Sequence, residues 1–287
     1  MSARHGVLAC LGFVAPAMAQ LFTTDAGVMS PELPTVKERI QWLVREDSEE
    51  LRATTRFSFA PHRRLQLDLA LPFARREVEV AGVGGVRRGT QEGLGDLELD
   101  AKWGLVRDDD VMRSDRLSVL GRLSLPTGDT DDRIDGIALG PRVALGLDTW
   151  GGSLGLGYTL VRDRHRAAIA VRAAAFAQNE LFDSGEEVTL DVAWWVRLTP
   201  REFDPEQASV EVRGVLEVLG RWKQDDELVD VDLQNGGTEW SFVVGAQMNL
   251  DPATSFEAGL TVPLDTSIES PFGDPRYGLL FSFRLSF

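Results

Sequence analysis

Cysteine is almost absent from this chain of 287 residues, which holds only Cys10. One cysteine cannot form an internal disulfide, so no disulfide framework supports the fold. Histidine is also scarce, and neither His62 nor His165 stands beside a serine in a recognisable catalytic motif. We therefore expect no enzyme of the Ser-His or Asp-His type. The loop GDTDDRIDG (128–136) lacks the ligand and glycine positions of a calcium loop, so we also expect no metal and no cofactor.

The sequence also lacks a hydrophobic run long enough for a membrane-spanning helix. Beyond the first 19 residues the longest apolar stretch is AAIAVRAAAFA (167–177), which Arg172 interrupts. A spanning helix needs about 20 apolar residues. Basic residues are in the minority, 30 Lys plus Arg against 45 Asp plus Glu, so we expect no nucleic-acid partner.

The N-terminal segment MSARHGVLACLGFVAPAMA (1–19) has a basic head, an apolar stretch and small residues at Ala17 and Ala19. This is the pattern of a secretory signal peptide, and we expect cleavage before Gln20. Two alternatives are an N-terminal membrane anchor, for which the apolar run is short, and a lipoprotein cut before Cys10. Export would bring the chain to the cell envelope.

Alternation of apolar and polar residues dominates the rest of the sequence. In VTLDVAWWVRL (188–198), for example, every second residue is apolar, with Asp191 and Arg197 on the opposite face. Such faces persist for ten residues or more, which is longer than most strands of water-soluble proteins. Strands of about 9 to 11 residues are what a tilted crossing of hydrocarbon requires. We therefore predict an all-β protein, a transmembrane antiparallel up-and-down β-barrel, rather than a soluble β fold.

About twelve segments show this pattern: 51–60, 65–73, 96–105, 117–126, 137–150, 153–161, 166–178, 188–198, 209–222, 240–250, 255–264 and 277–287. Short links such as 61–64 and 250–254 should face the periplasm. Successive connections between strands must lie on alternate sides of the membrane. Counting them from the two chain ends gives conflicting sides in the middle of the chain, so one strand is miscounted, at 37–44 or at 166–178. We assign 49–287 to the barrel, and leave 20–48 as a plug, a first strand or a disordered segment.

The last strand, YGLLFSFRLSF, places six apolar residues on one face. A terminal phenylalanine after alternating apolar residues is typical of the signal that the barrel-assembly machinery reads on a closing strand. The alternative is an edge strand of a soluble sandwich, which would leave a long apolar edge open to aggregation. The predicted assembly signal is Tyr277, Leu279, Phe281, Phe283, Leu285 and Phe287.

The opposite faces of the predicted strands carry charges of both signs, which we assign to the lumen: Asp68, Glu98, Asp100, Lys102, Arg122, Asp191, Arg197, Glu211, Arg213, Glu217, Arg221, Glu257 and Arg284. Opposite charges in a narrow barrel should pair across the bore. This predicts a narrow passive channel for small solutes, including hydrophobic or aromatic ones, with cation preference from carboxylates at the mouths. The alternatives are a structural or adhesion barrel without transport and a lipid-modifying enzyme.

Three short motifs carry a resemblance to a known family. LALPFA (69–74), GLGDLELDAKWGL (93–105) and LSLPTGD (123–129), together with the terminal FSFRLSF, resemble the outer-membrane family named after the phenol-degradation meta pathway. The resemblance covers most of the chain from about Leu51. It implies a porin-like barrel of the bacterial outer membrane that passes aromatic or other hydrophobic solutes, and it supplies no catalytic residues.

Outer-membrane lipid and lipopolysaccharide are the partners expected for such a barrel. The basic cluster RDRHR (162–166) is the sequence feature that could meet lipopolysaccharide phosphates; the alternative is a charged turn between two strands.

The terminal aromatic residue gives a test of assembly. Deleting Phe287, or replacing it with aspartate, should lower the amount of folded, heat-modifiable barrel in the outer membrane while export continues. Phe287→Trp serves as the control, because it keeps a large apolar ring at the last position. Equal yields of folded protein for all three variants would contradict the prediction.

Overall fold

The computed structural model describes residues 34–82, 85–110, 113–130, 133–134, 137–138, 145–146, 148–178, 182–200, 210–228, 231–269 and 273–287. The predicted signal segment 1–19 and residues 20–33 lie outside this part of the chain. Among the described residues no helix is long and apolar enough to cross a membrane.

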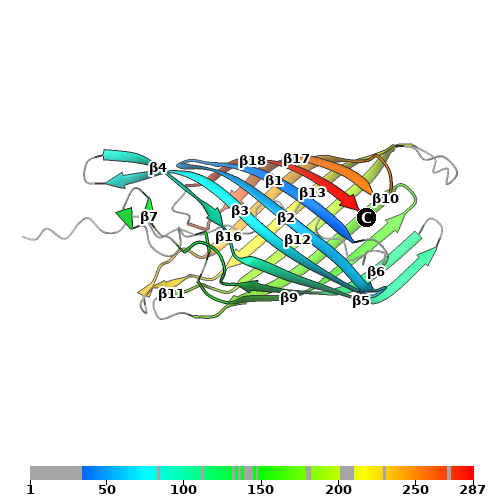
Figure 1. Ribbon diagram of the computed structural model, residues 1–287, viewed down its shortest axis with the longest axis horizontal. Coiled ribbons are helices and arrows are strands. Elements are labelled where there is room, and N and C mark those ends of the chain that lie inside the picture. The colour runs from blue at the N-terminus through cyan, green and yellow to red at the C-terminus, as the bar shows by residue number, and fades with distance from the viewer. Residues whose placement is uncertain are drawn as a thin grey trace, which may run out of the picture.

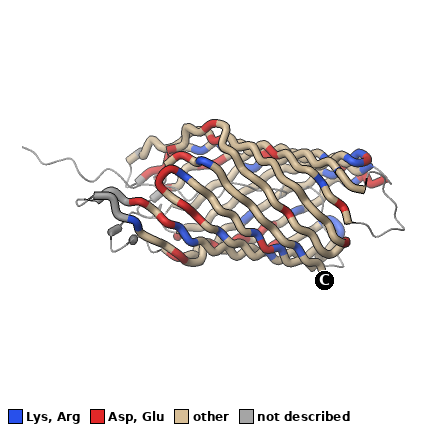
Figure 2. Tube along the Cα trace, turned by 90° about the horizontal axis from the view of Figure 1, so that it is seen from above, with Lys and Arg blue, Asp and Glu red and all other residues tan. Residues whose placement is uncertain are grey.

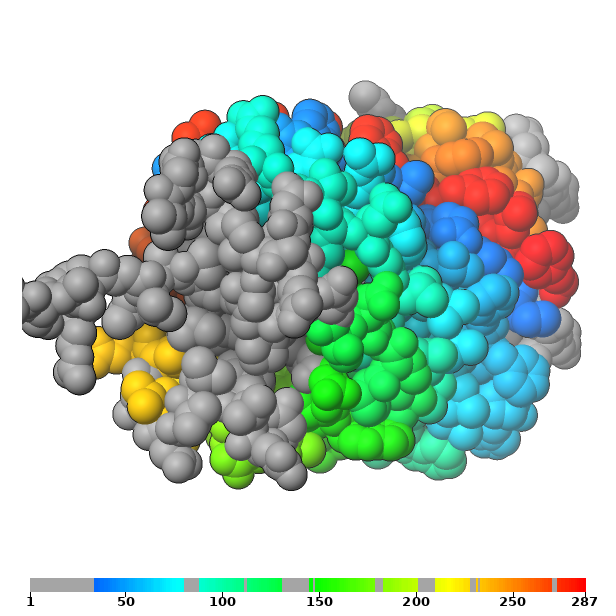
Figure 3. Space-filling model, turned by 60° about the vertical axis from the view of Figure 1, so that its left-hand side comes forward, coloured from blue at the N-terminus to red at the C-terminus, as the bar shows by residue number. Residues whose placement is uncertain are grey.

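Twelve long antiparallel strands form a closed barrel (Figure 1). They are β1 Thr35–Arg45, β2 Ser48–His62, β3 Leu65–Gly82, β5 Leu97–Asp110, β6 Arg113–Leu125, β9 Gly151–Arg162, β10 His165–Phe176, β12 Glu187–Thr199, β13 Glu211–Lys223, β16 Gly237–Asn249, β17 Thr254–Thr266 and β18 Pro275–Ser286. Each pairs with its neighbours along the chain, and β1 pairs with β18 from Thr35↔Ser286 to Val44↔Tyr277. On the surface, the red C-terminal strand lies beside the blue N-terminal strand (Figure 3). The predicted all-β barrel of twelve strands is confirmed.

The remaining short strands lie outside this set of twelve. They are β4 Gly85–Leu94, β7 Arg133–Ile134, β8 Ile137–Ala138, β11 Phe182–Asp183, β14 Glu227–Leu228 and β15 Val231–Asp232. β4 forms a hairpin with residues 73–82 of β3, and β5 pairs with residues 65–70 of the same strand. β4 and β5 thus follow one another along one edge of β3, with a break at Gly95 and Asp96.

One of the expected segments was wrong, although the number of strands was right. Segment 137–150 is not a barrel strand: among its described residues only β8 is extended, and 145–146 and 148–150 are not. Its place is taken by β1, which lies in the segment 20–48 and moves the start of the barrel from 49 to Thr35. With this exchange the conflict over sidedness disappears, and 166–178 contains a true strand, β10.

Connections of different length gather at the two ends of the barrel. Residues 63–64, 163–164 and 250–253 form tight turns at one end, where Phe287 N also donates to Pro34 O at 2.9 Å. This is the right-hand end in Figure 1, and the longer connections, apart from that between β12 and β13, lie at the other end together with the two-residue turn 46–47 between β1 and β2. Short turns face the periplasm in bacterial barrels of this kind. The basic cluster 162–166 contains the two-residue turn between β9 and β10, as expected if the cluster is a charged turn between two strands.

The glycine-rich motifs meet where β4 gives way to β5. Gly128 N donates to Asp96 Oδ1 at 3.0 Å, and Leu97 N donates to Thr127 Oγ1 at 3.0 Å. A Cβ atom at Gly128 would lie 2.7 Å from the carbonyl carbon of Gly95. Only glycine allows these two backbones to approach so closely, so the glycine at this position serves packing.

The two faces of the barrel wall differ as the alternation predicts. Ile40, Val192 and Phe281 point outward and remain 48, 41 and 54% exposed. Five of the six assembly-signal residues lie on this outer face of β18, where Tyr277 packs edge-on against Trp42 with ring centroids 6.1 Å apart, and the sixth, Phe287, follows the strand and is exposed. The inner face carries charges but also two small apolar clusters, one of Leu219, Val243 and Leu280 and the other of Ala168, Ala193, Trp195 and Val215.

The face assignment can be tested on one strand with two arginine substitutions. Val244, on β16, is exposed on the outer face, whereas Gln247 on the same strand points inward and donates to Glu257 Oε1 at 3.3 Å. Val244→Arg should destabilise the folded barrel by about 2–4 kcal/mol, the cost of arginine near the centre of a bilayer.

Gln247→Arg is the matched variant, because it brings the same side chain next to a carboxylate inside the barrel. It should cost far less in a denaturant titration of protein folded into lipid vesicles. Equal losses of stability for the two variants would mean that the inner and outer faces are misassigned.

Candidate functional site

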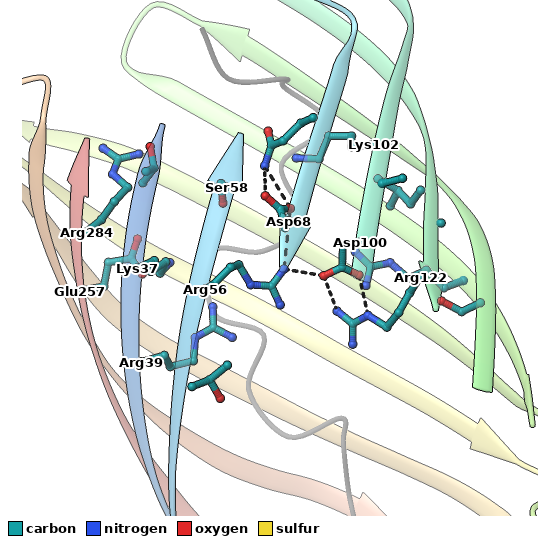
Figure 4. Close-up of a pocket in the computed structure, with 18 of the residues that line it drawn as sticks. Lys37, Arg39, Arg56, Ser58, Asp68, Asp100, Lys102, Arg122, Glu257 and Arg284 are labelled. Atoms are coloured by element: carbon teal, nitrogen blue, oxygen red, sulfur yellow. Dashed lines mark hydrogen bonds and ion pairs between the residues drawn. The ribbon is translucent and has the colours of Figure 1, made fainter. Parts of the chain in front are cut away.

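A cavity of about 210 Å³ lies inside the barrel wall. Figure 4 shows side chains from β1, β2, β3, β5 and β6 pointing into it. The remaining lining residues come from β9, β10, β12, β16, β17 and β18, so nearly the whole circumference contributes. This is the geometry of a lumen and not of a pocket on one wall.

An arginine–aspartate cluster occupies one side of this cavity. Asp100 Oδ1 accepts from Arg122 Nε at 2.6 Å, and Asp100 Oδ2 accepts from Arg56 Nη1 at 2.6 Å. Register explains the contact with Arg122, since Asp100 and Arg122 are paired across β5 and β6. Asp68 is paired with Asp100 across β3 and β5, and Arg56 Nη1 also lies 3.8 Å from Asp68 Oδ2. Arg56 thus offsets the repulsion of two carboxylates placed directly opposite each other.

Glu98 and Glu257 are also held by basic partners. Glu98 Oε2 lies 3.1 Å from Arg122 Nη1 and 3.9 Å from Arg56 Nη2. Lys37 Nζ, on β1, donates at 2.6 Å to Glu257 Oε2 on β17, with one strand between them in the sheet. These ion pairs join strands that are adjacent or one strand apart, so they run along the barrel wall and do not cross the bore, contrary to the prediction from the sequence.

The lining of this cavity is unequal in charge. Its three carboxylates, Asp68, Asp100 and Glu257, each lie within ion-pair distance of a basic lining residue. The basic lining residues number eight: Lys37, Arg39, Arg56, Lys102, Arg122, Arg166, Arg172 and Arg284. The cavity therefore carries a basic surplus inside a chain whose net charge is −15.

A second cavity of about 390 Å³ lies toward the end with the tight turns. Arg197, Glu211 and Arg213 line it, and Arg213 Nη2 donates to Glu211 Oε2 at 2.8 Å. Arg166 and Trp195 line both cavities, and the Arg166 guanidinium carbon lies 5.1 Å from the centre of the Trp195 ring. The two spaces follow one another along the barrel, with this stacked pair between them.

Further ion pairs lie toward the end with the longer connections. Arg221 Nε donates to Glu187 Oε2 at 3.1 Å, and Arg76 Nε donates to Glu50 Oε2 at 2.8 Å. Lys223 Nζ lies 2.5 Å from Asp226 Oδ2, and both side chains are fully buried. These pairs brace the interior of the barrel on that side.

All thirteen residues assigned to the lumen from the sequence occupy inward-facing positions. Six line the first cavity (Asp68, Asp100, Lys102, Arg122, Glu257 and Arg284), and three line the second (Arg197, Glu211 and Arg213). Glu98 joins the arginine cluster and Arg221 pairs with Glu187. Asp191 and Glu217 are buried in the interior, and neither carboxylate oxygen of Glu217 has a hydrogen-bond partner among the described residues.

Sequence reasoning missed five basic residues of the first cavity: Lys37, Arg39, Arg56, Arg166 and Arg172. The first two lie in the segment 20–48, which the sequence left open between a plug, a first strand and a disordered segment. The other three lie in segments recognised as strands, and reading their polar faces would have found them. Charged residues are in fact spread along the strands and not only at their ends (Figure 2).

Comparison with known proteins supports the fold. No protein-family model matches the sequence, and no curated protein does. Among solved structures, the chain is similar to the COG4313 outer membrane channel from Pseudomonas putida F1, with a TM-score of 0.71 at 15% identity, over 93% of this chain and 100% of that one. LpxR from Salmonella typhimurium (TM-score 0.45, 13% identity, 88% of this chain and 100% of that one) and the NanC porin (TM-score 0.44, 9% identity, 88% and 98%) are more distant. The architecture is thus that of bacterial outer-membrane barrels.

The arginine–aspartate cluster gives a test of how the interior is held together. Asp100→Asn removes the charge that faces both Arg56 and Arg122, and should lower the free energy of unfolding by about 1–3 kcal/mol. Glu77→Gln is the control: its pair with Arg75, at 3.6 Å, lies on the outer surface with both side chains more than half exposed. That change should stay within about 0.5 kcal/mol.

A double-mutant cycle completes this test. Asp100→Asn combined with Arg122→Gln should cost less than the sum of the single changes, because the second change removes the charge that the first leaves uncompensated. Strict additivity would show that these side chains do not interact.

Proposed function

We propose that this protein is a narrow passive channel of the bacterial outer membrane for small solutes. The observation that carries the proposal is the pair of cavities that follow one another along the barrel and share Arg166 and Trp195. Similarity in fold to the outer membrane channel of Pseudomonas putida F1 supports it.

The width of the barrel favours a narrow bore. Barrels of about eight strands are filled by their own side chains, whereas those of 16 to 18 strands leave an aqueous channel. Twelve strands fall between these limits, and here the interior is further reduced by the ion pairs of Arg56, Asp100 and Arg122 and by Trp195. Small solutes would pass by threading between these side chains.

The same proposal includes an orientation of the barrel in the outer membrane. We infer that the tight turns face the periplasm and that the outward residues of β18 are read by the barrel-assembly machinery. Two stacked pairs near the tight turns support this orientation of the barrel. His165 stacks on Trp194 with ring centroids 5.6 Å apart, and His62 stacks similarly on Trp103. Both tryptophans are outward-facing and close to the tight turns, where barrels carry an aromatic girdle at the membrane interface. Lipopolysaccharide in the outer leaflet would then meet the end with the longer connections.

The alternative functions receive less support. A lipid-modifying enzyme would need a histidine or carboxylate next to a nucleophile, whereas both described histidines contact tryptophan rings on the outer wall. A structural or adhesion barrel needs no lumen, yet polar side chains from nearly every strand of this barrel line an internal cavity.

Planar-bilayer recordings test the channel directly. Purified protein should give small conductance steps, and Trp195→Ala should raise the step size roughly twofold, because it removes a large uncharged side chain common to both cavities. Trp194→Ala is the matched control, since the neighbouring ring on the same strand points outward.

Two results would count against the channel. If Trp194→Ala and Trp195→Ala changed conductance equally, the proposed path through the barrel would be wrong. If the folded protein gave no conductance and no solute uptake in proteoliposomes, the structural or adhesion role would be favoured.

A further inference from the structure

The basic surplus of the first cavity is the feature from which we infer a solute class. Its three lining carboxylates are paired with Arg56, Arg122 and Lys37. Five further basic residues line the same space: Arg39, Lys102, Arg166, Arg172 and Arg284. Adding the nearby interior carboxylates Glu98, Asp191 and Glu217 still leaves more basic than acidic groups.

The wall opposite β1 and β2 makes room for one of these cations. Gly155, on the inner face of β9, lies opposite Arg172 on β10. A Cβ atom at Gly155 would come within 2.6 Å of Arg172 Cγ and 2.3 Å of the Val171 carbonyl oxygen. The absence of a side chain at Gly155 therefore lets the Arg172 side chain lie against the wall at the cavity.

We propose that this cavity selects small organic anions, such as carboxylates, and passes them in preference to cations. Guanidinium groups match a carboxylate with two parallel hydrogen bonds, and ammonium groups add charge. The inference rests on the proposed channel function and deepens it by naming the class of solute.

The acidic residues at the rim have little effect on this preference inside the barrel. Exposed carboxylates such as Glu46, Glu79 and Asp274 lie at the rim with the longer connections. Charges in contact with bulk solvent are screened within about 10 Å at 0.1 M salt. Charges that enclose a narrow, low-dielectric space act on every ion that passes. The cation preference expected from carboxylates at the mouths is thus replaced by selection at the basic cavity.

Reversal potentials across a potassium chloride gradient test the inference. The native protein should be anion-selective, and the double variant Arg172→Gln/Arg284→Gln should lower the chloride-to-potassium permeability ratio at least roughly twofold. Arg75→Gln is the control, because it removes a cation from the outer surface and should leave the ratio unchanged.

Three probes of similar size then identify the charge that the cavity accepts. Benzoate should reduce the current in a concentration-dependent way and with lower affinity in the double variant, whereas benzylamine and benzyl alcohol should not. Inorganic phosphate, run in parallel, shows whether any anion suffices: block by benzoate supports the inference, and block by phosphate without block by benzoate would contradict the organic-anion class.

The outcomes separate the two proposals. Conductance with cation selectivity, or block by benzylamine and not by benzoate, would overturn the anion site while leaving the channel intact. A folded protein without conductance would overturn the channel. Calorimetric titration of benzoate into the folded protein then decides the anion site alone: binding weakened in the double variant supports it, and no binding rejects it.

Discussion

The structure depends on one constraint, which is that every backbone polar group in hydrocarbon must find a partner within the protein. A sheet meets this requirement only when its edges are joined, and here β1 and β18 pair along nearly their full length. Closure leaves no free edge in the membrane and also fixes the width of the barrel. Inward side chains from all twelve strands must then share one narrow space, which is why the chemistry of the interior follows from the way the sheet closes.

Register within that closed sheet decides which charges meet. Asp68 and Asp100 are placed opposite each other on β3 and β5, an arrangement that would be unfavourable for two carboxylates alone. The next strands on either side supply Arg56 and Arg122, whose guanidinium groups reach Asp100 at 2.6 Å. A shift of β5 by one residue would turn its carboxylates toward lipid and its leucines inward. The ion pairs and the apolar outer face therefore specify the same register.

Alternation in the sequence was sufficient to predict the barrel and the inner face of strands such as β12, whose outer positions are uniformly apolar. It left β1 undecided for a physical reason: Glu38 lies on the outer face, where Thr55 Oγ1 donates to it at 3.0 Å, and this charge obscures the apolar pattern of Ile40 and Trp42. It failed at 137–150, where alternation occurs in a connection between strands. The contacts between Asp100, Arg56 and Arg122 could not be derived, because register across strands is not encoded in the periodicity of any one strand.

Assigning β1 to the barrel changes the electrostatic description as well as the topology. β1 carries Lys37 and Arg39 on its inner face, so omitting it removes two of the eight basic residues that line the first cavity. With β1 in place, eight basic residues and three carboxylates line the first cavity. Net charge describes how the whole molecule meets polyanions and solvent. It does not describe a bore that is isolated from most of that charge. In this barrel the net charge of the chain is negative, whereas the lining of the first cavity is basic.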